Sequence, residues 1–419
     1  MSTPPALNRL LRWRPGLVAR NTFHASVWNG VRIALQAASL VLMARVLGVE
    51  GYGALAGTVA LFMACGQFTG LGSGIALVRH AARGGPMRRR FAATVRAYLL
   101  SGIALTLLVI PLALVLLGAM IPLSALVLLA MAETLLAPLL LPLVYRYQAE
   151  ERMFLSSAIG TLAPVVRLIA VAAMAALGAH SIASFAQIYV ASLVPVVAIT
   201  LWLGWPRKAD HSTCTARQAV REGLPYAVSG FALSAGSELD KTVLLRLAGE
   251  AVTGPYAAAY RIASAATLPV NALILAASPR LFRVSSTQNP RLAAAMLAVV
   301  TGYGLLAAAA LWLLAPFAPW LLGHGFDNAT SLLRWMCILV VTGSLRQYTT
   351  ALLTTGDMQG IRNTIEIGAI GITLGLLLLL VPSHGAYGAI FAAGLGDAAI
   401  ILAGTMFMTT KKRTRTRNE

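Results

Sequence analysis

Residues 97–120 read AYLLSGIALTLLVIPLALVLLGAM, a run that contains no charged side chain. An α-helix needs about 20 apolar residues to cross the hydrocarbon core of a bilayer. This run is long enough to cross once, and residues 292–315 form a second run of the same kind. Both stretches therefore predict membrane-spanning helices.

The composition extends this prediction to the whole chain. Of 419 residues, 58% are hydrophobic and 11% are charged, and the mean hydropathy is +0.76. Soluble domains are about 45–50% apolar and about 25% charged, so a soluble enzyme is excluded. Twelve spans would take roughly 240 residues, which leaves little chain for any other domain.

Apolar runs of helical length recur along the sequence and predict an all-α integral membrane protein. The expected spans are residues 22–47, 52–78, 97–118, 121–145, 153–178, 181–205, 222–248, 254–280, 292–315, 329–355, 363–382 and 385–409. We expect these twelve helices to form two six-helix lobes. The expected divisions are a basic tail (1–21), an N-lobe (22–205), a connection (206–221), a C-lobe (222–409) and a second basic tail (410–419).

The basic residues predict the orientation of the spans. Of the 33 Lys and Arg residues, 25 lie in the two tails or on alternate connections. The positive-inside rule places such segments in the cytoplasm, so both termini are expected there. The net charge of +19 then reflects topology and contact with lipid headgroups, and no nucleic-acid partner is expected. Arg32 interrupts the first apolar run, so no signal peptide is expected.

The sequence offers no pattern for a metal, a disulfide framework or a nucleotide. The three cysteines lie far apart, and no phosphate-binding loop is present. The connections expected on the outer side are short, the longest being residues 316–328. We therefore expect no catalytic residue and no cofactor, and all function must lie within the helical bundle.

A turn is repeated at a distance of half the chain. Residues 47–53 read LGVEGYG, and residues 247–256 read LAGEAVTGPY. Both turns contain a Leu, a Gly and then an acid. In both, a Gly and a Tyr follow and open the next span. Each turn belongs to a set of six predicted spans, which indicates two parallel repeats. Transporters built in this way bind their substrate between the halves near the bilayer midplane.

These segments carry a family resemblance. Residues 42–53, LMARVLGVEGYG, resemble the first-hairpin signature of the Wzx-type polysaccharide flippases, within the multidrug/oligosaccharidyl-lipid/polysaccharide (MOP) exporter superfamily. Asp240-Lys241 and residues 254–261, GPYAAAYR, resemble the signature of the seventh and eighth spans. The resemblance implies two lobes in a V, which turn undecaprenyl-pyrophosphate-linked oligosaccharides from the inner to the outer leaflet of the bacterial inner membrane.

The family also implies a place in surface polysaccharide biosynthesis. Lipid II flippases of the superfamily usually carry two more spans, so a chain with about twelve resembles the O-antigen (lipopolysaccharide) and exopolysaccharide branch. A polysaccharide polymerase or assembly complex is the implied protein partner. Transport is expected to use H⁺ or Na⁺ if it is ion-coupled, and the sequence selects neither.

Ionisable residues within the spans are the candidate site, because a charge in the bilayer core marks either function or a pair. Arg32 shares a helix face with Trp28, Gln36 and Ser39. Its guanidinium suits two phosphate oxygens at once, so Arg32 either binds the substrate or pairs with an acid of another helix. Glu133 and Arg167 lie at the same expected depth. They are expected to pair, with ion coupling at Glu133 as the alternative.

In the second half, the expected depth brings Asp240 close to Arg261. We expect these two to pair across the hairpin, which would leave Lys241 free to face the cavity. Residues 260, 264, 267 and 271 are expected to form one polar face for sugar hydroxyls. Arg346 and Asp397 lie within a turn of the same depth, and pairing and substrate contact are equally open for them.

These considerations define two sets of residues. The expected substrate-binding residues are Arg32, Gln36, Lys241, Arg261, Arg346, Tyr260 and Asn271. The residues expected to pair or to couple an ion are Glu133, Arg167, Asp240 and Asp397. Glu366 and Arg334 are expected to reach the bilayer surface from span ends, Glu366 beside Arg362.

Three other functions remain open on the sequence alone. Cation-coupled drug exporters of the same superfamily typically carry a carboxylate in the first span, where this chain has Arg32. A membrane polymerase or ligase would need a larger outer loop for its catalytic residues. A scaffold for a glycan assembly complex would need no cavity at all.

Overall fold

A computed structural model describes residues 17–118, 120–207, 215–283, 290–355 and 358–418, and this part of the chain is helical without a β-strand. The helices are α2 (Leu17–Gly66), α3 (Ser73–Ala82), α4 (Arg88–Leu117), α5 (Leu123–Met131), α6 (Leu141–Ala149), α7 (Met153–Gly160), α8 (Leu162–Ala176), α9 (Ile182–Leu203), α10 (Ala216–Ala248), α11 (Glu250–Ala266), α12 (Leu268–Arg283), α13 (Pro290–Leu314), α14 (Ala318–Leu322), α15 (Asn328–Thr355) and α16 (Gln359–Asn418).

Within the described residues, eight helical segments are long and apolar enough to cross a membrane. The two longest, Ser26–Ala82 and Gly360–Thr410, contain 57 and 51 residues and reverse at Gly48 and Gly385. α10 is not among the eight, because it carries Glu238, Asp240 and Lys241 in its apolar part. The all-helical, membrane-spanning class is confirmed, and the count of twelve stays a prediction.

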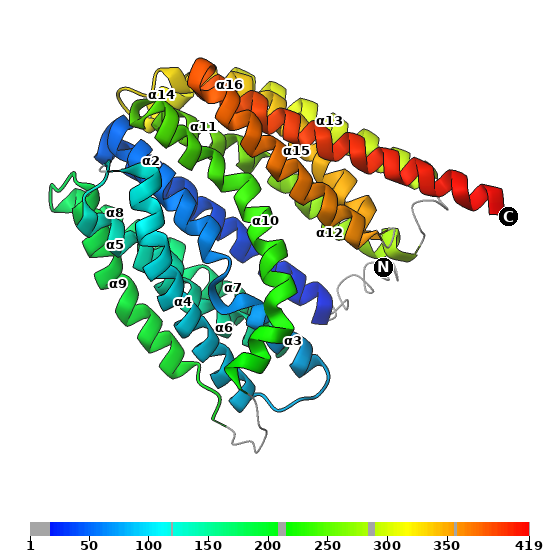
Figure 1. The fold of residues 1–419 in the computed structure, drawn as a ribbon, viewed down its shortest axis with the longest axis horizontal. Helices are drawn as coiled ribbons and strands as arrows, with labels where there is room; N and C mark the ends of the chain where they lie inside the picture. Colours follow the sequence, from blue (N-terminus) through cyan, green and yellow to red (C-terminus); the bar gives the residue numbers. More distant parts are fainter. Residues whose placement is uncertain (1–16, 119, 208–214, 284–289, 356–357, 419) are drawn as a thin grey trace, which may run out of the picture.

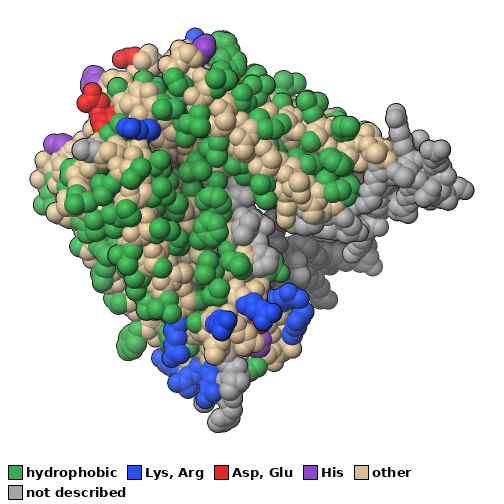
Figure 2. All heavy atoms as spheres, in the orientation of Figure 1, with side chains coloured by type: hydrophobic (Ala, Val, Ile, Leu, Met, Phe, Trp, Pro, Cys, Tyr) green, Lys and Arg blue, Asp and Glu red, His purple; other side chains and the backbone are tan. Residues whose placement is uncertain are grey.

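The exterior of the bundle is apolar between two polar ends. Large apolar side chains are exposed along its length, among them Leu107, Trp202 and Leu379, each more than two thirds exposed. Figure 2 shows most of the visible Lys and Arg gathered at one end of the molecule, and most of the visible Asp, Glu and His at the other, beside a few Lys and Arg. We name the first of these the basic end. The exposed Arg83 directly follows α3, and the exposed Arg88 and Arg89 are the first two residues of α4.

Both repeated turns have the same backbone conformation. Gly48 has φ 70° and ψ −176°, and Gly249 has φ 81° and ψ 178°. This region of φ and ψ is open essentially to glycine alone. It reverses the chain within one residue, so α2 folds back on itself and α11 follows α10 directly.

α10 runs antiparallel to the second segment of α2 and to α3 (Figure 1). The Thr242 hydroxyl donates a 2.8 Å hydrogen bond to the Gly57 carbonyl, and a Cβ on Gly57 would lie 2.6 Å from Leu245 Cβ. Farther along, a Cβ on Gly72 would lie 2.0 Å from the Gly223 carbonyl oxygen. The first and second halves of the chain are therefore in backbone contact along this helix pair.

The contact continues at the repeated turns. A Cβ on Gly53 would lie 2.1 Å from the Glu250 carbonyl oxygen, and one on Gly254 would lie 2.3 Å from that of Val49. The approach brings two like charges together, and burial, together with the nearby Glu50 carboxylate, raises the pKa of Glu250. At each turn a glycine, which has no side chain, therefore lets the backbone of the other turn pack directly against it.

An ion pair joins the two halves toward the basic end. Arg90 on α4 is buried, with 2% of its side chain exposed, and its Nη2 lies 2.5 Å from Glu222 Oε2 on α10. α10 is thus fixed to the first half near Gly223 by close packing and by a charge-assisted hydrogen bond.

The turn contact predicts opposite effects at two glycines of α2. Gly53→Ala introduces a Cβ into the Glu250 carbonyl and should lower the thermal unfolding midpoint of the purified protein, since overpacking typically costs about 1–3 kcal/mol. Gly30→Ala is the matched control, because nothing lies within 4 Å of its added Cβ. Its midpoint should be unchanged or higher, as alanine favours the helix. Equal midpoints for the two variants would contradict the close contact.

Candidate functional site

A cavity of about 240 Å³ lies between helices of both halves. Its charged lining consists of Arg32 from α2, Glu133 from the short π-helical turn Ala132–Leu136, Arg167 from α8 and Arg261 from α11. We name it the arginine cavity. Its polar lining includes Gln36, Ser39, Tyr52 and Tyr189.

Two of these arginines have no acidic partner among the residues that the structure describes. Arg32 Nη2 donates a 2.8 Å hydrogen bond to Asn29 Oδ1 on its own helix, and Arg261 lies beside Tyr52. Among the described residues, neither guanidinium has a carboxylate oxygen within 4.0 Å. The pairing considered for Arg32 is therefore not found in the described part of the chain, and its charge faces the cavity.

The third arginine is neutralised. Arg167 forms an ion pair with Glu133, whose side chain is 7% exposed, and its guanidinium lies 5.5 Å from the Tyr189 ring centre. The expected Glu133–Arg167 pair is confirmed. The π-helical turn inserts one extra residue into the helix and so changes the direction in which Glu133 points. Such turns are frequent at functional sites.

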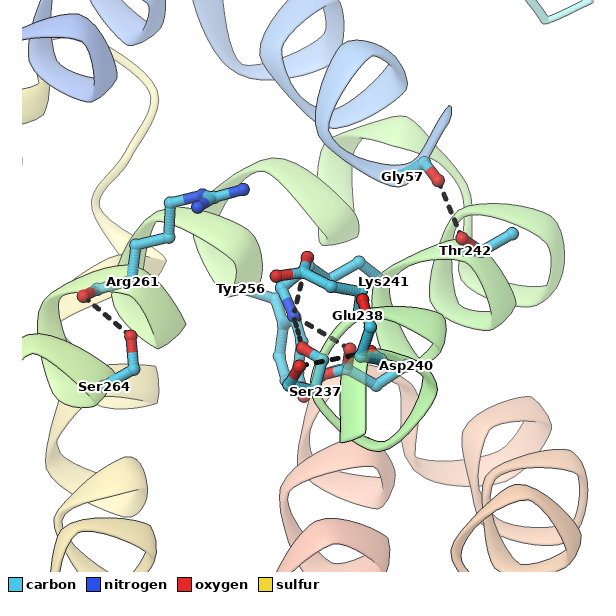
Figure 3. A network of polar contacts seen from close by, with 10 residues as sticks. Gly57, Ser237, Glu238, Asp240, Lys241, Thr242, Tyr256, Arg261 and Ser264 are labelled. Carbon is cyan, nitrogen blue, oxygen red and sulfur yellow. Dashed lines mark hydrogen bonds and ion pairs between the residues drawn. The ribbon is translucent and has the colours of Figure 1, made fainter. Parts of the chain in front are cut away.

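Asp240 and Lys241 form a buried cluster instead of the expected arrangement (Figure 3). Lys241 Nζ lies 2.9 Å from Asp240 Oδ1, donates a 2.6 Å hydrogen bond to the Ser237 carbonyl and lies 3.8 Å from the Tyr260 ring centre. The Tyr256 hydroxyl donates a 2.6 Å hydrogen bond to Asp240 Oδ2. The expectation of an Asp240–Arg261 pair was therefore wrong, and so was that of a free Lys241.

Helix rotation explains this correction. Tyr256 and Tyr260 are four residues apart on α11 and share the face toward α10. Arg261 follows Tyr260 and is rotated by about 100° from it. Its side chain consequently lies outside the Asp240–Lys241 cluster, with no interaction drawn to it in Figure 3.

A second cavity, of about 180 Å³, lies among α10, α11, α15 and α16. We name it the carboxylate cavity, because its charged lining is Arg346, Asp397 and Glu366. Arg346 Nε lies 2.7 Å from Asp397 Oδ1, and the Thr342 hydroxyl donates a 3.0 Å hydrogen bond to Asp397 Oδ2. Its neutral polar lining is Ser237, Tyr260, Ser264, Thr267, Gln347 and Thr373.

The remaining expected residues are divided between these places. Gln36 lines the arginine cavity and Tyr260 the carboxylate cavity, whereas Asn271 is exposed on α12 and lines neither. Glu366 pairs with Arg362 at 3.0 Å, but it lines the carboxylate cavity instead of only reaching a span end. Sequence reasoning missed Gln347, although it follows Arg346 directly.

Among the described residues, no group of three His, Cys, Asp or Glu side chains could hold a metal ion. The chemistry available is binding: guanidinium groups in one cavity, and carboxylates, hydroxyls and an amide in the other.

Comparison with known proteins identifies the family. Residues 18–285 match the sequence model of the polysaccharide biosynthesis proteins, which covers more than half of the chain. The chain therefore belongs to this family, and the MOP-superfamily resemblance is confirmed. No curated protein shows a matching sequence.

Solved structures share the fold at low sequence identity. The lipid II flippase MurJ in an inward closed conformation is 12% identical, with a TM-score of 0.66 over 92% of this chain and 87% of that chain. An inward-facing multidrug resistance MATE transporter of the MOP superfamily is 16% identical, with a TM-score of 0.61 over 92% and 95%. With its apolar helices, the chain is thus a multi-pass membrane protein with a MATE- and MurJ-like fold.

The description of a third similar structure concerns the polarity of its binding pocket. It is a MOP superfamily transporter from Pyrococcus furiosus, for which reverse polarity of the binding pocket suggests a different function. It is 17% identical, with a TM-score of 0.57 over 99% of each chain.

The Glu133–Arg167 pair predicts a rescue. Glu133→Gln leaves the Arg167 charge without its carboxylate and should destabilise the purified protein by about 3 kcal/mol. The double variant Glu133→Gln/Arg167→Gln removes both charges and should recover part of the loss. Thermal unfolding of the two variants and the parent in one detergent measures this. A double variant less stable than Glu133→Gln alone would contradict the pairing.

Proposed function

We propose that the protein is a flippase for undecaprenyl-pyrophosphate-linked oligosaccharide repeat units, which it moves from the cytoplasmic to the outer leaflet of the bacterial inner membrane. The glycan would serve O-antigen or exopolysaccharide biosynthesis, upstream of a polysaccharide polymerase or assembly complex. One observation carries the proposal: Arg32 and Arg261, from different halves of the chain, face one cavity without an acidic partner among the described residues.

The cost of these charges supports a diphosphate ligand. An arginine at the centre of a membrane helix costs about 2.5–3.5 kcal/mol on insertion scales, so an unpaired one marks a functional site. A guanidinium donates two parallel hydrogen bonds to a phosphate, which is stronger and more specific than a point charge. A diphosphate between Arg32 and Arg261 would supply the missing negative charge.

The same charges argue against the drug-exporter alternative. The arginine cavity contains three arginines and one glutamate, and that glutamate is paired with Arg167. An organic cation would meet net repulsion there. MATE structures are similar in fold, but at these identities the likeness extends to the fold alone. The family and the structural neighbours also favour a transporter over a polymerase.

Binding by both halves gives a route to release. Arg32 and Arg167 belong to the first half and Arg261 to the second. If alternating access rotates one half against the other, the diphosphate loses either Arg32 or Arg261 and is bound more weakly on the outer side. Glu133 and Asp397, each paired with an arginine, are the candidate carboxylates for coupling to H⁺ or Na⁺.

Removing either unpaired arginine should abolish transport. In a deletion strain, plasmid-borne Arg32→Ala and Arg261→Ala should leave lipid-linked oligosaccharide accumulated and surface polysaccharide absent, with normal protein levels in the membrane. Arg32→Lys keeps the positive charge but cannot donate two parallel hydrogen bonds to a phosphate, so partial activity is expected. Arg246→Ala, an exposed arginine outside both cavities, is the control and should restore export. Export by Arg32→Ala would overturn the proposed site.

The proposal includes twelve spans with both termini in the cytoplasm, supported by the gathering of Lys and Arg at the basic end. In a cysteine-free background, a membrane-impermeant maleimide added to intact cells should label Ser383→Cys and leave Ala82→Cys unlabelled until the membrane is permeabilised. Both positions are exposed: Ala82 is the last residue of α3, and Ser383 lies two residues before Gly385, which contacts Val252 beside the second repeated turn. The reverse labelling pattern would refute this orientation.

A further inference from the structure

We propose that the carboxylate cavity binds one sugar ring of the glycan, as a subsite separate from the arginine cavity that binds the diphosphate. This inference rests on the proposed function and assigns a ligand to a second site. It starts from a difference in charge: one cavity has three arginines and one glutamate, and the other has one arginine and two carboxylates.

The charges of the carboxylate cavity disfavour a phosphate. Its single arginine, Arg346, is neutralised by Asp397 at 2.7 Å. Glu366 adds a second carboxylate to the lining, held by Arg362. A diphosphate would therefore meet carboxylate oxygens and no unpaired guanidinium, so the anionic part of the substrate is directed to the other cavity.

The hydrogen-bonding groups suit a ligand that donates. The hydroxyls of Ser264 and Thr267 each donate to a backbone carbonyl three residues earlier, at 3.0 and 2.8 Å. Their protons are used, and what remains for a ligand is acceptor capacity. Sugar hydroxyls can donate to these oxygens, whereas a fully ionised phosphate has only acceptors.

An unsatisfied buried atom points to the same ligand. The side-chain oxygen of Gln347 is buried and has no hydrogen-bond partner in the described part of the chain. Burying an acceptor without a partner costs about 1–3 kcal/mol, which a donating ligand would recover. Gln347 lines the cavity beside Arg346, so a rotation of its amide would turn this oxygen from its buried position toward a sugar hydroxyl in this space.

The position of the cavity agrees with a glycan attached to a diphosphate. Tyr260 lines the carboxylate cavity, and the next residue, Arg261, lines the arginine cavity. Consecutive Cα atoms are about 3.8 Å apart, so α11 is a thin wall between neighbouring subsites. At about 180 Å³ the cavity is smaller than the roughly 300–1,000 Å³ of drug-sized sites, which suits one ring and not a whole repeat unit.

The test separates the two subsites with two probes. The first is farnesyl diphosphate, which has no sugar. The second is the oligosaccharide released by mild acid from the lipid-linked pool of a deletion strain, which has no diphosphate. Binding of each probe to the purified full-length protein is measured by calorimetry for the first and by saturation-transfer NMR for the second.

Three variants give the expected pattern. Gln347→Leu should weaken oligosaccharide binding about tenfold, the equivalent of about 1.4 kcal/mol, and leave farnesyl diphosphate affinity unchanged. Arg32→Ala should do the reverse. Ser264→Ala removes one acceptor oxygen at an exposed position and should weaken only the oligosaccharide, so it replaces Gln347→Leu if that variant fails to fold.

The outcomes distinguish the inference from the proposed function. Oligosaccharide binding that survives both Gln347→Leu and Ser264→Ala overturns the sugar subsite while the flippase proposal stands. Loss of oligosaccharide binding in Arg32→Ala overturns the separation into two subsites. A parent protein that binds neither probe overturns the proposed function itself.

Discussion

The structure depends on a backbone-to-backbone contact between the two halves of the chain. Gly53 packs against the Glu250 carbonyl, Gly57 against Leu245, and Gly72 against Gly223, so helices of different halves approach more closely than side chains would allow. In a bilayer, such close packing replaces the hydrophobic effect as the source of helix association. It also positions α11, which supplies Arg261 to one cavity and Tyr260 to the other.

Within this frame, the charges of the interior fall into two groups. Glu133 with Arg167, Asp240 with Lys241, and Asp397 with Arg346 are paired and hydrogen-bonded, as buried charges must be. Arg32 and Arg261 face a cavity without a carboxylate among the described residues. The paired groups hold the walls of the cavities, and the unpaired ones define which ligand charge the first cavity accepts. The second cavity differs because its Ser264 and Thr267 hydroxyls have already donated their protons to the backbone.

The sequence predicts the depth of a residue along its helix better than the direction in which the residue points from the helix axis, and this difference explains which parts of the site were predicted. Arg32 and Gln36 were placed correctly, because their spacing defines a face within one continuous helix, and Glu133 and Arg167 met because their depths agree. Depth says nothing of rotation, so Asp240 was assigned to Arg261 instead of Lys241 and Tyr256. Of the polar face expected on residues 260–271, Tyr260, Ser264 and Thr267 do line one cavity. Asn271 does not, since α11 ends at Ala266 and α12 begins at Leu268, which changes the phase of the helix. Gln347 escaped notice because an amide carries no charge to mark it.

The glycine turns have a consequence for biogenesis. At Gly48 and Gly249 the chain reverses within one residue, so the next helix starts almost where the previous one stops. In the proposed orientation these turns must cross the bilayer during synthesis, and each brings with it one acid and one nearby arginine, Glu50 with Arg45 and Glu250 with Arg246. Two consecutive helices can therefore leave the translocation machinery as a closed hairpin, with hardly any hydrophilic loop to carry across. The same turns that lock the halves together in the finished protein would thus lower the barrier to inserting it.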